Sequence, residues 1–320
     1  MTNSVVSRLG QINGAGATDA LFLKLFGGEV IVTFDKSTVF KDRHTIRQIA
    51  NSKSAQFPFI GAATASYHTP GNFIDGQQID HAEKVIIIDD LLVSSTFIAS
   101  IDEAMNHYDV RQPYSQELGR ILAQTYDSNV ARMFVKAARA ASPIDGRAGG
   151  SEIDHELMAT DSAVLGKAIF AAAQVLDEKD VPSNERFGFF KPAQFYLLAQ
   201  NKDLINKDYG GQGDIAKGSF ESLAGVEIVK TNNVPSTNVT TGPTKYQGDF
   251  TKTVGIIGNK RAAATVKLMD LAMESEYEIR RQGTFMVAKY AVGHDTLQPD
   301  CAVELKVGAS GDTSLAPTTH

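Results

Sequence analysis

The sequence predicts an α+β protein organised as an arm, an extended two-stranded ribbon, a long helix on a small sheet, and a separate α/β domain. Three observations lead to this fold class. An apolar stripe with helical spacing runs through residues 113–141, residues 53–88 hold few apolar side chains, and residues 146–264 alternate between helix and strand patterns. A chain of 320 residues buries about three quarters of its unfolded surface, so it needs no disulfides for stability.

The composition of the chain indicates where it folds and which kinds of partner it does not bind. The single Cys301 excludes an internal disulfide framework and favours folding in a reducing compartment. A net charge of −6 argues against a surface built to grip phosphates, and no segment has the unbroken apolar length of a membrane span or the form of a signal peptide. We therefore expect no membrane partner and no specific binding to nucleic acid.

The first segment, residues 1–52, is expected to be an arm. Its apolar clusters, such as LFLKLFGGEVIVTF, mix with Gly and Thr and keep neither a helical nor a strand period for long.

Residues 53–88 are expected to form a long two-stranded ribbon. Prolines, glycines and isolated aromatic residues precede a β-branched run, Val85 to Ile88, that indicates a returning strand. An isolated ribbon is marginal in water, so it must pack on its own domain or on another chain. The candidate residues for contact with a neighbouring subunit are Phe57, Phe59, Tyr67 and Phe73.

The long helix begins near Pro113, because proline suits the first helical turn, and ends at Ser142–Pro143. At 1.5 Å per residue it would be on the order of 40 Å long. Its predicted apolar face includes Leu118, Ile121, Leu122, Thr125, Tyr126, Val130, Met133, Phe134, Ala137 and Ala141. Its predicted polar face carries Gln116, Arg120, Gln124, Asp127, Arg132 and Lys136, of which Arg120 and Arg132 are further candidates for inter-subunit contact.

Residues 146–264 are expected to form one α/β domain. A helix capped by Thr160 or Asp161 is followed by the strand RFGFF, a helix that begins at Pro192, and the strands VEIVKT and TVGIIGN. Residues 265–307 then predict three or four strands, which the long helix would cover. This predicts a discontinuous domain of residues 89–145 and 265–307, followed by a flexible tail at 308–320.

Each catalytic motif fails at the residue that its chemistry requires. GAGATD at 14–19 lacks the third glycine of a dinucleotide loop, and GDIAKGS at 213–219 has Ser219 where a phosphate loop needs lysine. His155–Glu156 begins a zinc-protease pattern, but Ala159 stands where the second histidine belongs. Asp89–Asp90 follows a predicted strand and could be an acid/base pair, but adjacent residues on a strand point to opposite faces, which favours a strand end in water. We expect no catalytic residue, no metal and no cofactor, and therefore no enzyme.

Several segments resemble the major capsid protein of short-tailed bacteriophages of the autographivirus type. They are FLKLFGGEV, KSAQFP, EKVIIIDDLL, DEAMNHYDVR, AAATVKLMDLAME and AKYAVGH, and they are spread over most of the chain. The resemblance implies the Hong Kong 97 fold, with an N-terminal arm (1–52), an extended loop (53–88), a peripheral domain (89–145 and 265–307) and an axial domain (146–264).

The resemblance also implies a function and partners. The chain would assemble with itself into hexamers and pentamers of an icosahedral head that encloses double-stranded DNA without sequence preference. A portal protein would occupy one vertex. Because no charged helical segment precedes LFLKLFGGEV, the scaffolding protein is expected to be a separate chain. Assembly would take place in the bacterial cytoplasm, and the product would be part of the virion.

Two alternatives remain open from the sequence. A bacterial nanocompartment shell uses the same fold to enclose an enzyme, and would form small closed shells without a helper protein. An α/β enzyme could carry its site in loops that do not match the family, such as 206–225.

Overall fold

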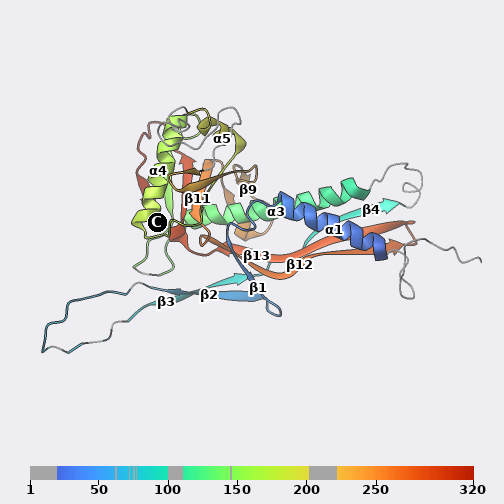
Figure 1. Ribbon diagram of the computed structural model, residues 1–320, viewed down its shortest axis with the longest axis horizontal. Helices are drawn as coiled ribbons and strands as arrows, with labels where there is room; N and C mark the ends of the chain where they lie inside the picture. The colour runs from blue at the N-terminus through green and yellow to red at the C-terminus, as the bar shows by residue number, and fades with distance from the viewer. Residues whose placement is uncertain are drawn as a thin grey trace, which may run out of the picture. The chain divides into compact units, whose positions relative to one another are not determined.

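The computed structural model describes residues 20–61, 63–71, 73–74, 76, 78–99, 111–144, 146–201 and 222–320, without the side chains of 20–28 and 111–112. The chain forms two compact units (Figure 1). The first unit comprises the described parts of Met1–Thr38, Asp89–Tyr126 and Met269–Val292, and the second comprises those of Val39–Ile88, Asp127–Leu268 and Gly293–His320.

The first unit joins two helices to three neighbouring strands of one sheet. It contains α1 (Ala20–Ser37), the start of α3 (Arg111–Ala138), β4 (Leu92–Ala99), and parts of β12 (Ala263–Glu278) and β13 (Gly283–Thr296). β13 pairs with β4. The rings of Phe34, Tyr126 and Tyr290 lie 5.5–5.9 Å apart between centroids and join α1, α3 and β13. The long helix therefore packs on a late strand, as predicted.

The helix α1 corrects the expectation of an irregular arm between residues 20 and 37. Ten of the eighteen residues of this segment are apolar, and they keep no single spacing, so no helical face could be predicted from them. Burial against the rest of the unit favours the helix, because Val30 and Phe34 are 0% and 4% exposed. The rest of the expected arm before residue 20 lies outside the described residues.

The second unit is built on a seven-stranded sheet with the order β15-β5-β14-β11-β6-β8-β7. β14 lies between β5, to which it is parallel, and β11, to which it is antiparallel. The strands are β5 (Ser151–His155), β6 (Arg186–Phe190), β7 (Ser222–Leu223), β8 (Val226–Lys230), β11 (Thr253–Asn259), β14 (Ala302–Val307) and β15 (Pro317–Thr319). Shorter elements are β9 (Asn238–Val239), β10 (Gly248–Asp249), η2 (Thr244–Tyr246) and η3 (Pro299–Cys301).

Two helices of this unit begin where the sequence predicts. The helix α4 (Ser162–Glu178) is capped by Asp161, whose Oδ1 accepts the N–H of Ala163 at 2.8 Å. The helix α5 (Pro192–Leu198) begins at its proline. Both confirm the local signals.

Two predicted boundaries are wrong at the end of the chain. β14 belongs to the seven-stranded sheet, and not to a domain made of 89–145 and 265–307. β15 pairs with β5, so residues 317–319 are not a flexible tail. The alternation in AVELKV indicates a strand but not its sheet. The segment PTT is too short to predict a strand, although threonine favours strands.

The predicted ribbon is confirmed. β2 (Ser54–Ile60) pairs antiparallel with β3 (His81–Ile87), and β1 (Thr45–Gln48) pairs parallel with β12. The base of the ribbon packs on its own unit in a cluster of buried residues, which are Ala55, Phe59, Ile86, Ile144, Ala264, Val266 and Leu297.

The long helix α3 is confirmed, but its end and several positions of its predicted faces differ. The helix ends at Ala138, four residues before Ser142. Ala141, assigned to the apolar face, lies beyond the helix and is exposed. Leu118, Leu122 and Tyr126 are buried as predicted. Ile121 is 39% exposed, whereas Asp127, assigned to the polar face, is 0% exposed because it binds the backbone of Val39 and Phe40.

Candidate assembly surfaces

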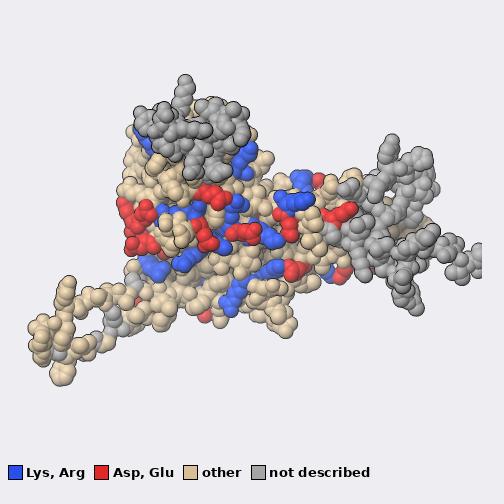
Figure 2. All heavy atoms as spheres, viewed as in Figure 1, with Lys and Arg blue, Asp and Glu red and all other residues tan. Residues whose placement is uncertain are grey.

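The outer part of the ribbon presents bare aromatic side chains. The loop between β2 and β3 projects from the second unit, and Gly71 supplies the left-handed conformation of its turn with φ +99° (Figures 1 and 2). Tyr67 and Phe73 are fully exposed, and Ile74 is 80% exposed. Bare apolar side chains that gather on one segment are typical of a contact surface.

The other two aromatic residues of the ribbon have partners in their own chain. Phe59 is 8% exposed and belongs to the cluster at the base of the ribbon. Phe57 packs against that cluster, and the guanidinium of Arg47 lies 5.5 Å from the centroid of its ring. Phe59 is therefore covered by its own chain, and Tyr67 and Phe73 are the exposed pair among the four aromatic residues.

The two arginines chosen on α3 do not converge on one site. Arg120 is exposed and binds Glu117, with Nη2 2.6 Å from Oε1, and it also donates to Gln124. Arg132 donates to Asn129 at 3.2 Å, and burial lowers the pKa of its guanidinium. Both arginines are therefore held by neighbours along the helix.

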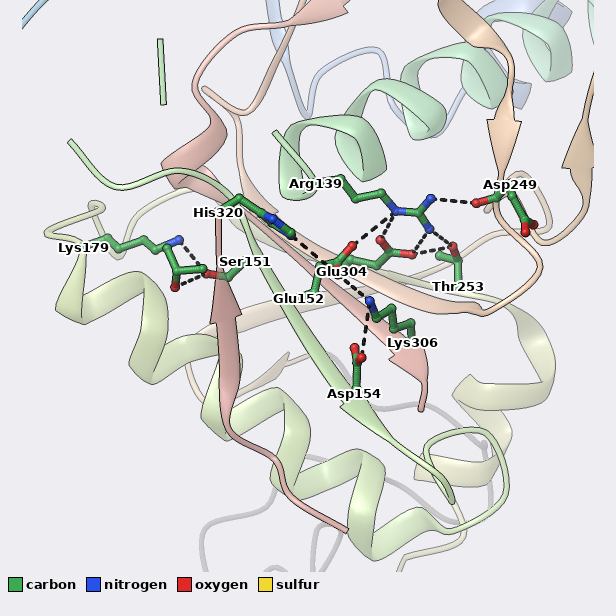
Figure 3. A network of polar contacts seen from close by, with 11 residues as sticks. Arg139, Ser151, Glu152, Asp154, Lys179, Asp249, Thr253, Glu304, Lys306 and His320 are labelled. Atoms are coloured by element: carbon green, nitrogen blue, oxygen red, sulfur yellow. Dashed lines mark hydrogen bonds and ion pairs between the residues drawn. The ribbon is translucent and has the colours of Figure 1, made fainter. Parts of the chain in front are cut away.

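The end of α3 is tied to the centre of the large sheet by a buried ion pair (Figure 3). Arg139 Nε and Nη2 donate to Glu304 Oε2 and Oε1 at 2.6 and 2.8 Å. Thr253 Oγ1 donates to the same carboxylate at 2.6 Å, and Glu304 is 0% exposed. We did not predict this site. The available signal was a glutamate inside the apolar strand AVELKV.

The rest of this network lies along β5 (Figure 3). Glu152 binds Lys306, which also lies 3.3 Å from Asp154 Oδ2. Lys179 Nζ donates to the carbonyl of Gly149 and to Ser151 Oγ, both at 2.7 Å. The charges of Arg139, Glu304, Glu152 and Lys306 compensate one another across β5 and β14. Lys179 is held by neutral oxygens, and it also lines a cavity of the second unit. These contacts join segments of the second unit, so the network is structural.

A cavity of about 440 Å³ in the second unit does not form a reactive site. Its lining includes Arg147 and Asp300, whose Nη1 and Oδ2 lie 3.6 Å apart. Cys301 also lines it, but burial raises the pKa of the thiol, which disfavours the reactive thiolate.

The failed motifs give no chemistry in the folded chain either. His155 Nδ1 accepts the N–H of Leu157, which is a local structural contact. Within the residues that the structure describes, no group of three or more His, Cys, Asp or Glu is placed to hold a metal. No helix in the same part of the chain is long and apolar enough to cross a membrane. The segments 14–19 and 213–219 lie outside the described residues, as does most of 206–225.

Comparison with solved structures assigns the fold to the Hong Kong 97-type shell proteins of bacteriophage capsids. The capsid structure of the cyanophage P-SCSP1u is similar with a TM-score of 0.79 and 43% identity, covering 97% of this chain and 100% of that one. The bacteriophage PhiM1 mature capsid has a TM-score of 0.73 at 17% identity, with 96% and 92% covered, which shows the fold alone. This defines the class of protein.

Sequence comparison then gives the family. Residues 56–306 match the Gp10A-like family, described as major capsid protein. The major capsid protein of Escherichia phage T7 is 34% identical over 317 residues, with 90% of this chain and 92% of the relative covered. That of Enterobacteria phage T3 is 33% identical, with 91% and 93% covered. The chain belongs to the Gp10A-like major capsid proteins, which build the phage head, and it is a component of the virion.

The sequence relationships place the chain with the phage proteins. A virus-like particle from Pyrococcus furiosus shares the fold, with a TM-score of 0.57, but only 14% identity over 89% of this chain and 99% of that one. The proteins of Escherichia phage T7 and the cyanophage P-SCSP1u are more than twice as similar in sequence, at 34% and 43% identity. The family is one of structural proteins.

Proposed function

We propose that this chain assembles into hexamers and pentamers that close an icosahedral head around double-stranded DNA. The observation that carries the proposal is the bare ribbon tip. Tyr67 and Phe73 lose no solvent contact within their own chain, so their apolar surface is available to a neighbouring subunit. Burying one such side chain is worth about 1.5–3 kcal/mol.

Weak contacts of this size suffice because each subunit makes several at once. Closure of a symmetric lattice makes each contact depend on the others, so the shell is far more stable than any pair of subunits. In this proposal the ribbon is the extended loop that reaches a neighbour, and the long helix stiffens the subunit. The chain acts by binding and carries out no catalysis.

The packaged DNA is held without reading its sequence. The net charge of −6 gives the chain little attraction to phosphates. Because the inner surface of the shell would bind DNA weakly, counterions would neutralise the DNA phosphates. We further propose that assembly takes place in the host cytoplasm with a separate scaffolding protein and a portal at one vertex. A sheet of similar subunits has no preferred size, so something besides pairwise contacts must set the curvature.

Electron microscopy of the chain expressed alone tests this proposal. We expect free subunits, tubes or irregular shells, and uniform icosahedra only when the scaffolding protein is added. Small, closed, monodisperse shells formed without a helper would favour a nanocompartment-like assembly instead.

A further inference from the structure

The outer edge of β5 is covered by a very short strand. β5 lies between β14 and β15 in the sheet. β15 pairs antiparallel with β5, with Pro317 opposite Ile153 and Thr319 opposite Ser151. All three residues of β15 are exposed to solvent, so little apolar burial holds this strand in place.

The register of β15 decides which of its backbone groups face β5. His320 N donates to the carbonyl of Gly150 at 3.1 Å, which makes these two residues a hydrogen-bonded pair. Hydrogen-bonded and non-hydrogen-bonded pairs alternate in an antiparallel ladder, so Thr318 and Glu152 form the next hydrogen-bonded pair. Pro317 and Thr319 occupy the other positions, where the backbone nitrogen points away from β5.

This placement lets proline close the edge without weakening the ladder. Pro317 has no N–H, but at its position that N–H would not have reached β5. An N–H at this position would face the outer side of β15, where it could pair with a further strand, and proline removes it. β15 therefore satisfies the backbone of β5 and stops the sheet from growing.

The chain next to β5 is shaped to accept such a strand closely (Figure 3). A Cβ on Gly149 would lie 2.1 Å from the carbonyl oxygen of His320, so only glycine leaves room there. Ser151 Oγ lies 3.1 Å from Thr319 Oγ1, and His320 Nε2 lies 3.6 Å from Glu152 Oε2. The edge of β5 is therefore suited to bind an extended segment with small hydroxyl side chains.

We propose that the outer edge of β5 is a strand-binding site for residues 317–320 of a second copy of this chain, which the chain's own β15 otherwise fills. The strand contacts of residues 317–320 are the same in both arrangements. Exchange also requires residues 308–316 to release their hydrogen bonds to His155 and Glu156, so it is decided by how closely the copies approach. Residues 308–316, fully extended, span roughly 30 Å, which is enough to reach an adjacent subunit. The inference does not depend on the geometry of the shell.

Peptide binding tests whether the edge is a site. A variant that lacks residues 316–320 should bind a labelled peptide of residues 313–320, TSLAPTTH, at least about tenfold more tightly than the full chain, whose site is filled. The Thr318→Pro peptide should not bind, because it lacks the N–H that faces Glu152. The matched Thr319→Pro peptide should bind nearly as well as the parent. Equal binding by the shortened and full chains, or by the two proline peptides, would overturn the proposal.

A second measurement covers the case in which the shortened variant does not fold. Shells are assembled from an equal mixture of full chains that carry either Ser151→Cys or Thr319→Cys, and are then oxidised. These residues face each other in a non-hydrogen-bonded pair, whose short Cβ separation suits a disulfide. Both variants also carry Cys301→Ser, and shells of each variant alone are the control for links between identical cysteines. A dimer that forms only in the mixture therefore reports exchange between copies. We expect dimers on a non-reducing gel, whereas monomers alone would exclude exchange in the shell.

Discussion

His44 and Asp127 hold opposite ends of the same buried residue, Phe40. Asp127 Oδ1 accepts the N–H of Phe40 at 3.2 Å, and Nδ1 of His44 lies 2.6 Å from its carbonyl oxygen. Phe40 is 0% exposed and its ring stacks on Phe189 at 4.1 Å. Two titratable groups therefore fix the backbone of a residue at the centre of the second unit.

The carbonyl of Phe40 also fixes the tautomer of His44. A carbonyl oxygen can only accept, so Nδ1 of His44 carries the proton and Nε2 is an acceptor. Thr265 Oγ1, 2.6 Å away, donates to that Nε2 and lies 2.7 Å from Nδ1 of His294. The hydroxyl of Thr265 thus accepts from His294 and donates to His44, and both imidazoles are neutral in this arrangement.

Acid should weaken the fold through these two histidines. Burial lowers the pKa of His44 to about 4, with Phe40 and Asp42 opposing the shift and Lys260 adding to it. Burial, His44 and Lys245 lower the pKa of His294. Between about pH 6.5 and 4 the unfolded chain binds a proton at each histidine more readily than the folded chain does. The free energy of unfolding is therefore highest above about pH 6.5 and decreases as the pH falls toward 4. We expect His44→Asn to be less stable at pH 7 by about 1–3 kcal/mol. Between about pH 6.5 and 4 the free energy of unfolding of this variant, measured in denaturant titrations, should fall less steeply than that of the unsubstituted chain. Equal dependence on pH in the two proteins would contradict the prediction.

Asp127 should act in the opposite direction over a similar range. Burial raises its pKa to about 6, although the N–H groups of Val39 and Phe40 and the amide of Asn233 oppose this. The folded chain then binds the proton more tightly than the unfolded chain. The contribution of Asp127 is therefore fully present below about pH 4 and is lost as the pH rises toward 6. We expect the destabilisation by Asp127→Asn to be larger at pH 4.5 than at pH 7. A cost that shrinks on acidification would show that the sign is wrong.

The ion pair of Arg139 and Glu304 should show strong coupling. Arg139→Met leaves a fully buried carboxylate without its cation and should lower the free energy of unfolding by about 3–5 kcal/mol. The double variant Arg139→Met, Glu304→Met should be less destabilised than that single variant, because it leaves no uncompensated charge. A double-mutant cycle in urea measures the coupling, and additive effects would refute it.

Gly119 tests how closely α1 and α3 approach in the first unit. Alanine normally stabilises a helix relative to glycine by about 1 kcal/mol. Here the new Cβ would lie 2.6 Å from the carbonyl oxygen of Val30, so we expect Gly119→Ala to destabilise by about 1–3 kcal/mol. Gly76→Ala is the control, because a Cβ there meets nothing within 4 Å. A more stable Gly119→Ala variant would mean that the helices separate freely.

The ribbon tip should matter for assembly and not for the fold. Tyr67→Ser with Phe73→Ser removes side chains that are fully exposed in the subunit, so its melting temperature should change little. Shell yield in sedimentation should fall sharply. The base provides the contrast, since Phe59→Ser should unfold the ribbon cluster. Normal shells from the double serine variant would show that the tip does not contact a neighbouring subunit. Equal resistance of the tip to protease in free subunits and in shells would show the same.

The local elements could be predicted from the sequence better than their assembly. The ribbon, the long helix and the starts at Asp161 and Pro192 follow from turn, capping and spacing signals that act within a few residues. The sheet that a strand joins depends on contacts between distant residues, which explains the wrong placement of β14.

The candidate surfaces show the same limit. Exposed and buried aromatic residues look alike in the sequence, so Phe59 could not be told from Tyr67. Asp127 and Glu304 are buried because backbone amides and Arg139 from other segments satisfy them, which residue spacing cannot reveal. The resemblance to phage capsid proteins gave the function, since no catalytic constellation pointed to one.

The place of β14 in the sheet also limits when the sheet can form during synthesis of the chain. β5 leaves the ribosome early, but its two partner strands are Ala302–Val307 and Pro317–Thr319. At typical synthesis rates the strand Ser151–His155 waits roughly 7 to 30 seconds for them. The edge of β11 that β14 will cover waits as well. The large sheet therefore closes only after Val307 has been synthesised, and in that interval its open backbone is exposed to chaperones and to other nascent copies.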